Sequence, residues 1–141
     1  MKYQVEVAIE EKYNLVASLF VDRDKMHLWE QGLSRIEDTK NKLFEAGSQG
    51  YLVFVFGPNE MKMKVTVEKS SLPSEITVIY ELSGAWNRCV NHFIGHDGQT
   101  KWVMESEFIF DQPNDIPLSA FIEKTTIGMQ AFKQFIEGIK K

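Results

Sequence analysis

The stretch "HDGQTKWVMESEFIF" (residues 96–110) decides the fold, because it contains a turn and the strand that follows it. Asp97-Gly98 is a favoured pair for a two-residue type I′ turn, in which both residues adopt positive φ. This turn places His96 opposite Gln99 and sets the register of a hairpin. One face of that hairpin then carries Asn87, Cys89, Asn91, Phe93, Trp102, Met104, Ser106 and Phe108. The other face is largely charged, which predicts an antiparallel pair with one buried and one solvated side.

Two asparagines on the buried face are unusual for a packing core. A buried amide without a partner costs about 1–3 kcal/mol, so Asn87 and Asn91 need water, a ligand or each other. The alternative is a register shifted by one residue, which would send both asparagines to solvent. That shift would also bury Arg88 and expose Trp102, so the first register is favoured.

Strands with the same alternation surround the hairpin. Turn signals at Ser83-Gly84 and at Gly57-Pro58-Asn59 predict about six strands between residues 33 and 110. Their inward face continues through Ile76, Val78, Tyr80, Leu52, Phe54, Phe56, Met61, Met63 and Val65. Residues 2–9 alternate in the same way and predict one further strand at the start of the chain.

Helical spacing occurs in three places. Residues 11–20 carry apolar residues at helical intervals, and Asp22 could cap a second short helix that contains Met26 and Trp29 and ends before Gly32. From Pro117 to the C-terminus, apolar residues recur as in one long amphipathic helix. The predicted fold class is therefore α+β, with an antiparallel sheet of about seven strands, two short helices after the first strand and a long final helix.

Two stretches carry a resemblance to a known family. "VEVAIEEKYNLVASLFVDRDKMHLWEQGL" (residues 5–33) resembles the opening strand and helix pair of the START-like superfamily, also called Bet v 1-like or SRPBCC, which includes polyketide cyclases. "HDGQTKWVMESEFIF" is similar to its last hairpin turn and strand. The family's usual proline near the first helix is replaced here by Glu11 or Lys12. The resemblance implies a helix-grip fold, in which the sheet wraps the C-terminal helix and encloses a cavity.

Composition limits the other classes of function. The 141 residues with 43% hydrophobic content suit a single domain over residues 1–141. Sixteen basic and 20 acidic residues are scattered along the chain, so no basic face is offered to nucleic acid. No apolar run approaches a membrane span, and the first residues alternate instead of forming a targeting segment. We therefore expect a cytoplasmic protein that is a monomer or a weak homodimer.

Residue patterns for catalysis or metal binding are weak. His92 and His96 would lie about 13 Å apart on a strand, too far to share a metal ion. Glu105 and Glu107 fall on the outer face, and Cys89 has no feature that would lower its pKa. We expect no metal, no cofactor and no carboxylate or histidine on the inward face.

The leading hypothesis is binding of a small hydrophobic ligand that is lipid-, sterol- or polyketide-like. The candidate ligand-binding residues are those expected on the inward faces of the sheet and the final helix: Phe54, Met63, Tyr80, Asn87, Cys89, Asn91, Trp102, Met104, Ser106, Met129 and Phe132. Trp29 is expected to close one end of the sheet. Within the same superfamily, a polyketide cyclase- or aromatase-like enzyme is the alternative, and a chaperone-activator-like protein-binding module is the third.

Overall fold

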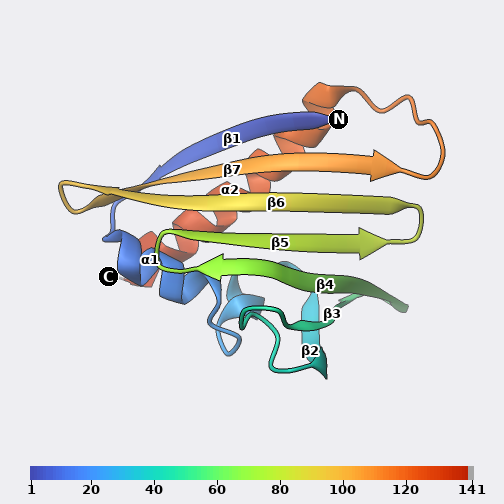
Figure 1. Cartoon of the computed structure of the whole chain (residues 1–141), viewed down its shortest axis with the longest axis horizontal. Helices are drawn as coiled ribbons and strands as arrows, with labels where there is room; N and C mark the ends of the chain where they lie inside the picture. The colour runs from blue at the N-terminus through green and yellow to red at the C-terminus, as the bar shows by residue number, and fades with distance from the viewer. Residues whose placement is uncertain (140–141) are drawn as a thin grey trace.

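The chain folds into one antiparallel sheet with a long helix across one of its faces (Figure 1). The computed structural model describes residues 1–139, and residues 140 and 141 lie outside that range. In chain order the elements are β1 (Lys2–Ile9), α1 (Tyr13–Phe20), the 3-10 turn η1 (Met26–Leu28), β2 (Leu33–Lys40), β3 (Gln49–Phe56), β4 (Asn59–Ser71), β5 (Glu75–Leu82), β6 (Ala85–His96), β7 (Gln99–Phe110) and α2 (Leu118–Ile139).

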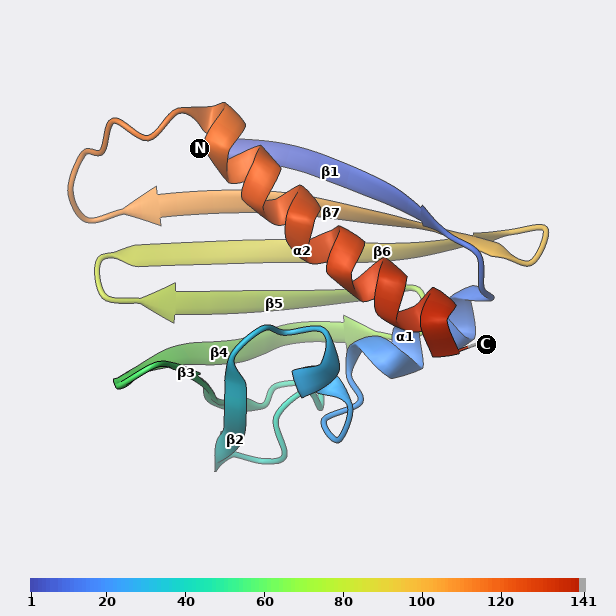
Figure 2. The ribbon, with the colours of Figure 1, turned by 180° about the vertical axis from the view of Figure 1, so that it is seen from behind.

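The first and last strands of the chain are neighbours in the sheet. Its strand order is β1-β7-β6-β5-β4-β3-β2, so β1 pairs with the last strand and β2 forms the opposite edge. Figure 2 shows α2 crossing the sheet diagonally, with its C-terminal end next to α1. This arrangement confirms the predicted helix-grip α+β fold. Between residues 1 and 139, neither helix combines the length and hydropathy that crossing a bilayer requires.

The second short helix is smaller than predicted. Only Met26–Leu28 form a single 3-10 turn. Asp22 was expected to cap a helix, but Lys25 precedes the 3-10 turn, and Asp22 Oδ1 accepts a hydrogen bond from the Asp24 backbone N–H at 3.1 Å. That bond closes a local turn, which competes with helix formation. The segment between α1 and β2 is therefore mostly irregular.

The predicted register of the last hairpin is confirmed. Asp97 and Gly98 have φ values of 50° and 79°, as a type I′ turn requires. Cys89 pairs with Ser106, and Asn91 pairs with Met104. The inward face continues onto β5 and β4 as expected, with a one-residue shift in the β4–β5 pairing between Val67 and Lys69.

An aromatic cluster fills the inner side where α1, η1 and α2 meet the sheet. The rings of Trp29 and Phe132 lie 4.6 Å apart, and Phe20 contacts Phe93, Trp102 and Phe132 with ring centroids 5.6–5.8 Å apart. Trp29 therefore packs its ring into this cluster, as expected, but it lies just after η1, and within residues 1–139 its buried Nε1 has no hydrogen-bond partner.

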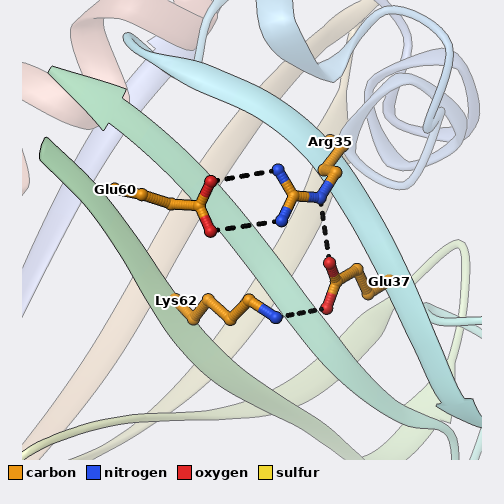
Figure 3. A network of polar contacts seen from close by, with 4 residues as sticks. All are labelled: Arg35, Glu37, Glu60 and Lys62. Carbon is orange, nitrogen blue, oxygen red and sulfur yellow. Dashed lines mark hydrogen bonds and ion pairs between the residues drawn. The ribbon is translucent and has the colours of Figure 1, made fainter. Parts of the chain in front are cut away.

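The outer face of β2, β3 and β4 carries a network of ion pairs (Figure 3). Arg35 on β2 binds both carboxylate oxygens of Glu60 on β4 at 3.2 Å, and its Nε donates to Glu37 at 2.9 Å. Glu37 also accepts from Lys62 at 3.0 Å. Arg35 and Lys62 both stand opposite Val53, which faces outward on β3 yet is 0% exposed. The network thus covers an apolar residue and ties the edge strand to β4.

Candidate functional site

The inner face of the sheet is closed at one end and partly accessible at the other. At the closed end, Val67, Ile76, Phe93 and Trp102 are at most 2% exposed. At the other end, which we call the open end, several inward residues are only half-buried: Met61, Met63, Tyr80, Asn87 and Phe108. Tyr3 and Met104 are also half-buried, but they lie in the same cross-strand rows as Val67 and Ile76.

The helix α2 shows the same gradient as the sheet. Its buried residues are Met129, Phe132 and Ile136, all in its C-terminal half. Its N-terminal half starts near the first residue of β1 and the end of β7 (Figure 2). There, Tyr3 Oη and Thr125 Oγ1 share a hydrogen bond of 2.7 Å. Contact between helix and sheet is therefore looser at the open end.

The structure divides the predicted ligand-binding residues into two groups. Met63, Tyr80 and Asn87 lie half-buried at the open end, and Met104 is half-buried in the middle of the inner face. The others are buried in the core or next to it: Phe54, Cys89, Asn91, Trp102, Ser106, Met129 and Phe132. The open-end group is thus the better placed to touch a ligand, and contact by either group stays a prediction.

Asn91 is held by the protein itself. Its Oδ1 accepts a hydrogen bond from Trp102 Nε1 at 3.1 Å, and its Nδ2 donates to the Ile76 carbonyl at 3.3 Å. Asn91 is 0% exposed. The buried amide therefore has partners on both of its polar atoms, so its burial does not by itself call for a ligand.

Asn87 also has protein partners. Its Nδ2 donates to Ser106 Oγ at 2.9 Å and to the Glu107 carbonyl at 3.0 Å. Its Oδ1 accepts from Cys89 Sγ at 3.2 Å. Burial raises the pKa of the Cys89 thiol to about 11, while its bonds to Ser106 and Asn87 act in the opposite direction. Cys89 is therefore a neutral thiol within a polar cluster, and not an activated nucleophile.

Tyr80 lies beside this cluster, with its hydroxyl group unpaired. Within residues 1–139, no hydrogen bond joins that hydroxyl to another residue. Burial raises the Tyr80 pKa well above its usual value, and the nearby Cys89 and Glu30 groups add to the effect. Glu30 was not among the site residues predicted from the sequence.

Glu30 corrects the expectation that no carboxylate faces inward. Burial raises the pKa of its carboxyl group to about 7. Across the described part of the chain, no hydrogen bond or ion pair involves that carboxyl group. Glu30 is therefore a partly buried acid, and its charge contributes to raising the Tyr80 pKa.

The turn between η1 and β2 places Glu30. The Glu30 N–H donates to the Met26 carbonyl at 2.9 Å, and the Glu30 carbonyl accepts from Leu33 N–H at 3.1 Å. Gly32 follows with φ of 84°, and a Cβ at that position would lie 2.6 Å from the Phe56 ring. The segment is irregular, so no periodic pattern in the sequence could have indicated which way Glu30 points.

The charged residues that were predicted to be outward do lie on the outer face. His92 Nε2 is 2.7 Å from Glu105 and its Nδ1 is 3.4 Å from Glu75. His96 is in the exposed turn, where it is 3.1 Å from Asp97. The two histidines therefore have separate carboxylate partners.

Two hollows lie on other surfaces. One of about 390 Å³ lies against β1, β6 and β7, beside outward residues such as Arg88 and Glu105. The other, of about 560 Å³, lies between residues 21–24 and residues 42–45. Neither is lined by α2, so the expected cavity between helix and sheet stays a prediction.

Comparisons of the sequence itself find no match, whereas solved structures match along nearly the whole chain. No protein-family model and no curated protein matches the sequence. Ara h 8.0201 superposes with a TM-score of 0.80 over 98% of each chain, at 9% identity. A START superfamily protein from Mycobacterium smegmatis gives a TM-score of 0.76 over 98% of each chain, at 10% identity.

The chain has the START-like, or Bet v 1-like, fold. DynU16, from the dynemicin biosynthetic locus, shares this START-like fold with a TM-score of 0.75 and 9% identity, over 96% of this chain and 47% of its own. At such identities the likeness establishes the START-like architecture and leaves function to be argued from the site.

Proposed function

We propose that the chain binds a small hydrophobic molecule between the open end of the sheet and the N-terminal half of α2. The observation that supports this most is the half-burial of Met63, Tyr80 and Met104 on the concave face. A core formed only for packing would bury such large apolar residues as fully as the closed end does. Methionine side chains also suit an adaptable apolar pocket. A lipid-, sterol- or polyketide-like molecule fits this lining.

Binding should depend on the inward side of β7. We expect the purified protein to bind anilinonaphthalene sulfonate in a saturable one-to-one manner, and native mass spectrometry to identify any compound it carries. Met104→Trp should abolish dye binding because the larger ring occupies the inner face. Glu105→Trp is the matched control, because it adds the same ring to the exposed outer face. Unchanged dye binding by folded Met104→Trp would refute the proposed location.

A cyclase-like enzyme is the second candidate, and Glu30 is the observation that favours it. A carboxyl group with a pKa of about 7 can both accept and donate a proton near neutral pH. Such a group could assist the closure of a reactive chain held against the inner face. Turnover of a polyketide-like substrate that is lost in Glu30→Gln would support this candidate.

Domain organisation, location and oligomeric state complete the proposal. We propose that residues 1–141 form one domain, located in the cytoplasm, without nucleic-acid partners. β2 is an edge strand with exposed charged residues, which disfavours strong edge-to-edge pairing. A monomer or weak homodimer is therefore expected, and light scattering across a range of protein concentrations would measure it.

A further inference from the structure

The indole of Trp29 carries a buried hydrogen-bond donor without an acceptor. Within residues 1–139, Trp29 Nε1 is a fully buried side-chain nitrogen, and no hydrogen bond joins it to another residue. Buried N–H groups in folded proteins are nearly always paired, because an unpaired one loses its bond to water and gains nothing in return. The Trp29 N–H therefore calls for an acceptor that these residues do not supply.

A second indole in the same aromatic cluster shows the pairing that Trp29 lacks. Trp102 and Trp29 both pack against the Phe132 ring, with centroids 5.2 and 4.6 Å away. Trp102 Nε1 donates to Asn91 Oδ1 at 3.1 Å. The ring neighbours of Trp29 are Phe20 and Phe132, whose side chains carry no acceptor. The fold thus supplies an acceptor to one of these two indoles and not to the other.

The packing of Trp29 directs its N–H away from solvent. The residue as a whole is only half-buried, yet its polar atom is fully buried. Stacking on Phe20 at 5.8 Å and the edge contact with Phe132 hold the ring in this orientation. Solvent outside the protein therefore does not reach the N–H, and the acceptor has to come from inside the fold.

The segment that carries Trp29 connects the aromatic cluster with the open end of the sheet. Leu33, four residues later, pairs with Phe54 on β3, and Phe54 pairs with Met61 at the open end. Residues 29–33 thus run from the Phe132 ring to the strands that border the open end. A ligand bound along the open end would extend toward the indole.

We propose that the ligand carries a neutral carbonyl group at its inner end, and that the carbonyl oxygen accepts a hydrogen bond from Trp29 Nε1. This inference rests on the proposed function, because the apolar body of the ligand would lie along the open end. A carbonyl oxygen is an acceptor without a donor of its own, so it requires nothing from the rings of Phe20 and Phe132. A hydroxyl group would bring an O–H that those rings cannot accept well.

The charge of the segment favours a neutral acceptor over a carboxylate. Glu30 follows Trp29 directly in the chain, and burial raises the pKa of its carboxyl group to about 7. A ligand carboxylate would add a further negative charge to a region that already disfavours one. A ketone or an ester therefore fits better than a fatty acid.

A matched pair of ligands tests the carbonyl group. Methyl octyl ketone and the alkene in which a methylene group replaces its carbonyl oxygen have nearly the same shape, and each is used to displace the dye. Trp29→Phe keeps an aromatic ring and removes the N–H. The ratio of ketone to alkene affinity should be about tenfold higher in wild type than in Trp29→Phe. Decanoate should bind wild type less tightly than the ketone.

Trp86→Phe is the matched control variant. Trp86 lies on the outer face, where it pairs with Glu81 and Ile109, so its replacement should leave the affinity ratio unchanged. Thermal melts establish that each variant is folded.

NMR of the indole N–H groups gives a readout on wild-type protein, which does not depend on the folding of Trp29→Phe. The chain has three tryptophans, and Trp86→Phe and Trp102→Phe identify their signals. The ketone should move the Trp29 N–H proton downfield, as a new hydrogen bond does, and the alkene should not. The Trp102 signal is an internal control, because its N–H is already bound to Asn91.

The outcomes distinguish the two proposals. An equal loss of ketone and alkene affinity in folded Trp29→Phe, or a Trp29 signal that responds equally to both compounds or to neither, would overturn the carbonyl site. Tighter binding of decanoate than of the ketone would overturn the neutral acceptor. In each case the binding itself would still support the proposed function. Failure of the dye and all three compounds to bind would overturn both proposals.

Discussion

At the scale of single residues, Asn91 supplies a buried hydrogen-bond acceptor for Trp102. Trp102 is 1% exposed, and its Nε1 donor has Asn91 Oδ1 as its acceptor at 3.1 Å. The same atoms explain why this part of β6 carries an amide where an apolar residue would be expected. A polar residue on a buried face can thus serve a neighbouring side chain instead of a ligand.

Asn91→Leu is expected to destabilise the protein. It leaves Trp102 Nε1 without an acceptor, so the free energy of unfolding should fall by about 1–3 kcal/mol. Urea denaturation measures this change. Trp102→Phe in the Asn91→Leu background removes the unpaired donor, so the double variant should lose less than the sum of the two single changes. Simple additivity would contradict the role assigned to Asn91.

Glu30 should make stability depend on pH. Its pKa rises from 4.5 to about 7 on folding, so the folded state holds this proton more tightly than the unfolded state. The resulting stability is fully present below pH 4.5 and is lost as the pH rises through 7, by about 3 kcal/mol. Glu30→Gln should therefore exceed wild type in stability at pH 8 and match it at pH 4. Urea denaturation at both pH values measures this, and an equal difference at both would argue against a buried acid.

At the scale of elements, α2 has two halves with different roles. Its C-terminal half presents Met129, Phe132 and Ile136 to the core, whereas residues 118–128 include no buried side chain. Phe121, in the N-terminal half, contacts Phe108 and Phe110 with ring centroids 5.1 and 5.7 Å apart. One helix thus anchors the fold at one end and covers the candidate site at the other.

The two halves should respond differently to truncation. Phe132 is 0% exposed, so Phe132→Ala should cost about 3–5 kcal/mol of stability through lost burial and a cavity. Phe121→Ala should cost clearly less, because that ring is only half-buried. Urea denaturation of both variants compares the halves directly. Equal losses would show that α2 packs uniformly along its length.

At the scale of the whole molecule, the gradient of burial runs through every layer. The sheet and α2 are tightly packed around the ring cluster at the closed end and loosely packed at the open end. Local unfolding is easiest where few apolar side chains are buried. The proposed ligand would therefore act mainly on the looser end.

Hydrogen exchange should follow the same gradient. Amides in residues 118–128 are expected to exchange faster than those in residues 129–139, because their half of α2 buries less surface. When an apolar ligand binds, amide hydrogen exchange should slow chiefly in residues 118–128 and at Tyr80. Mass spectrometry of peptides from both halves measures this. Uniform exchange along α2, or protection confined to its C-terminal half, would contradict a site at the open end.

Much of the fold could be predicted from the sequence, because strands, helices and tight turns each require a recognisable spacing or type of residue. The Asp97-Gly98 turn set the register of β6 and β7, and alternation placed Asn87 and Cys89 on the inner face, as the structure confirms. Tertiary structure alone decided that Asn91 accepts a hydrogen bond from Trp102, and that the Glu30 carboxyl group is partly buried with a raised pKa. Such contacts join residues far apart in the chain or within an irregular turn. These contacts depend on how distant segments pack against one another, which a periodic sequence pattern does not indicate.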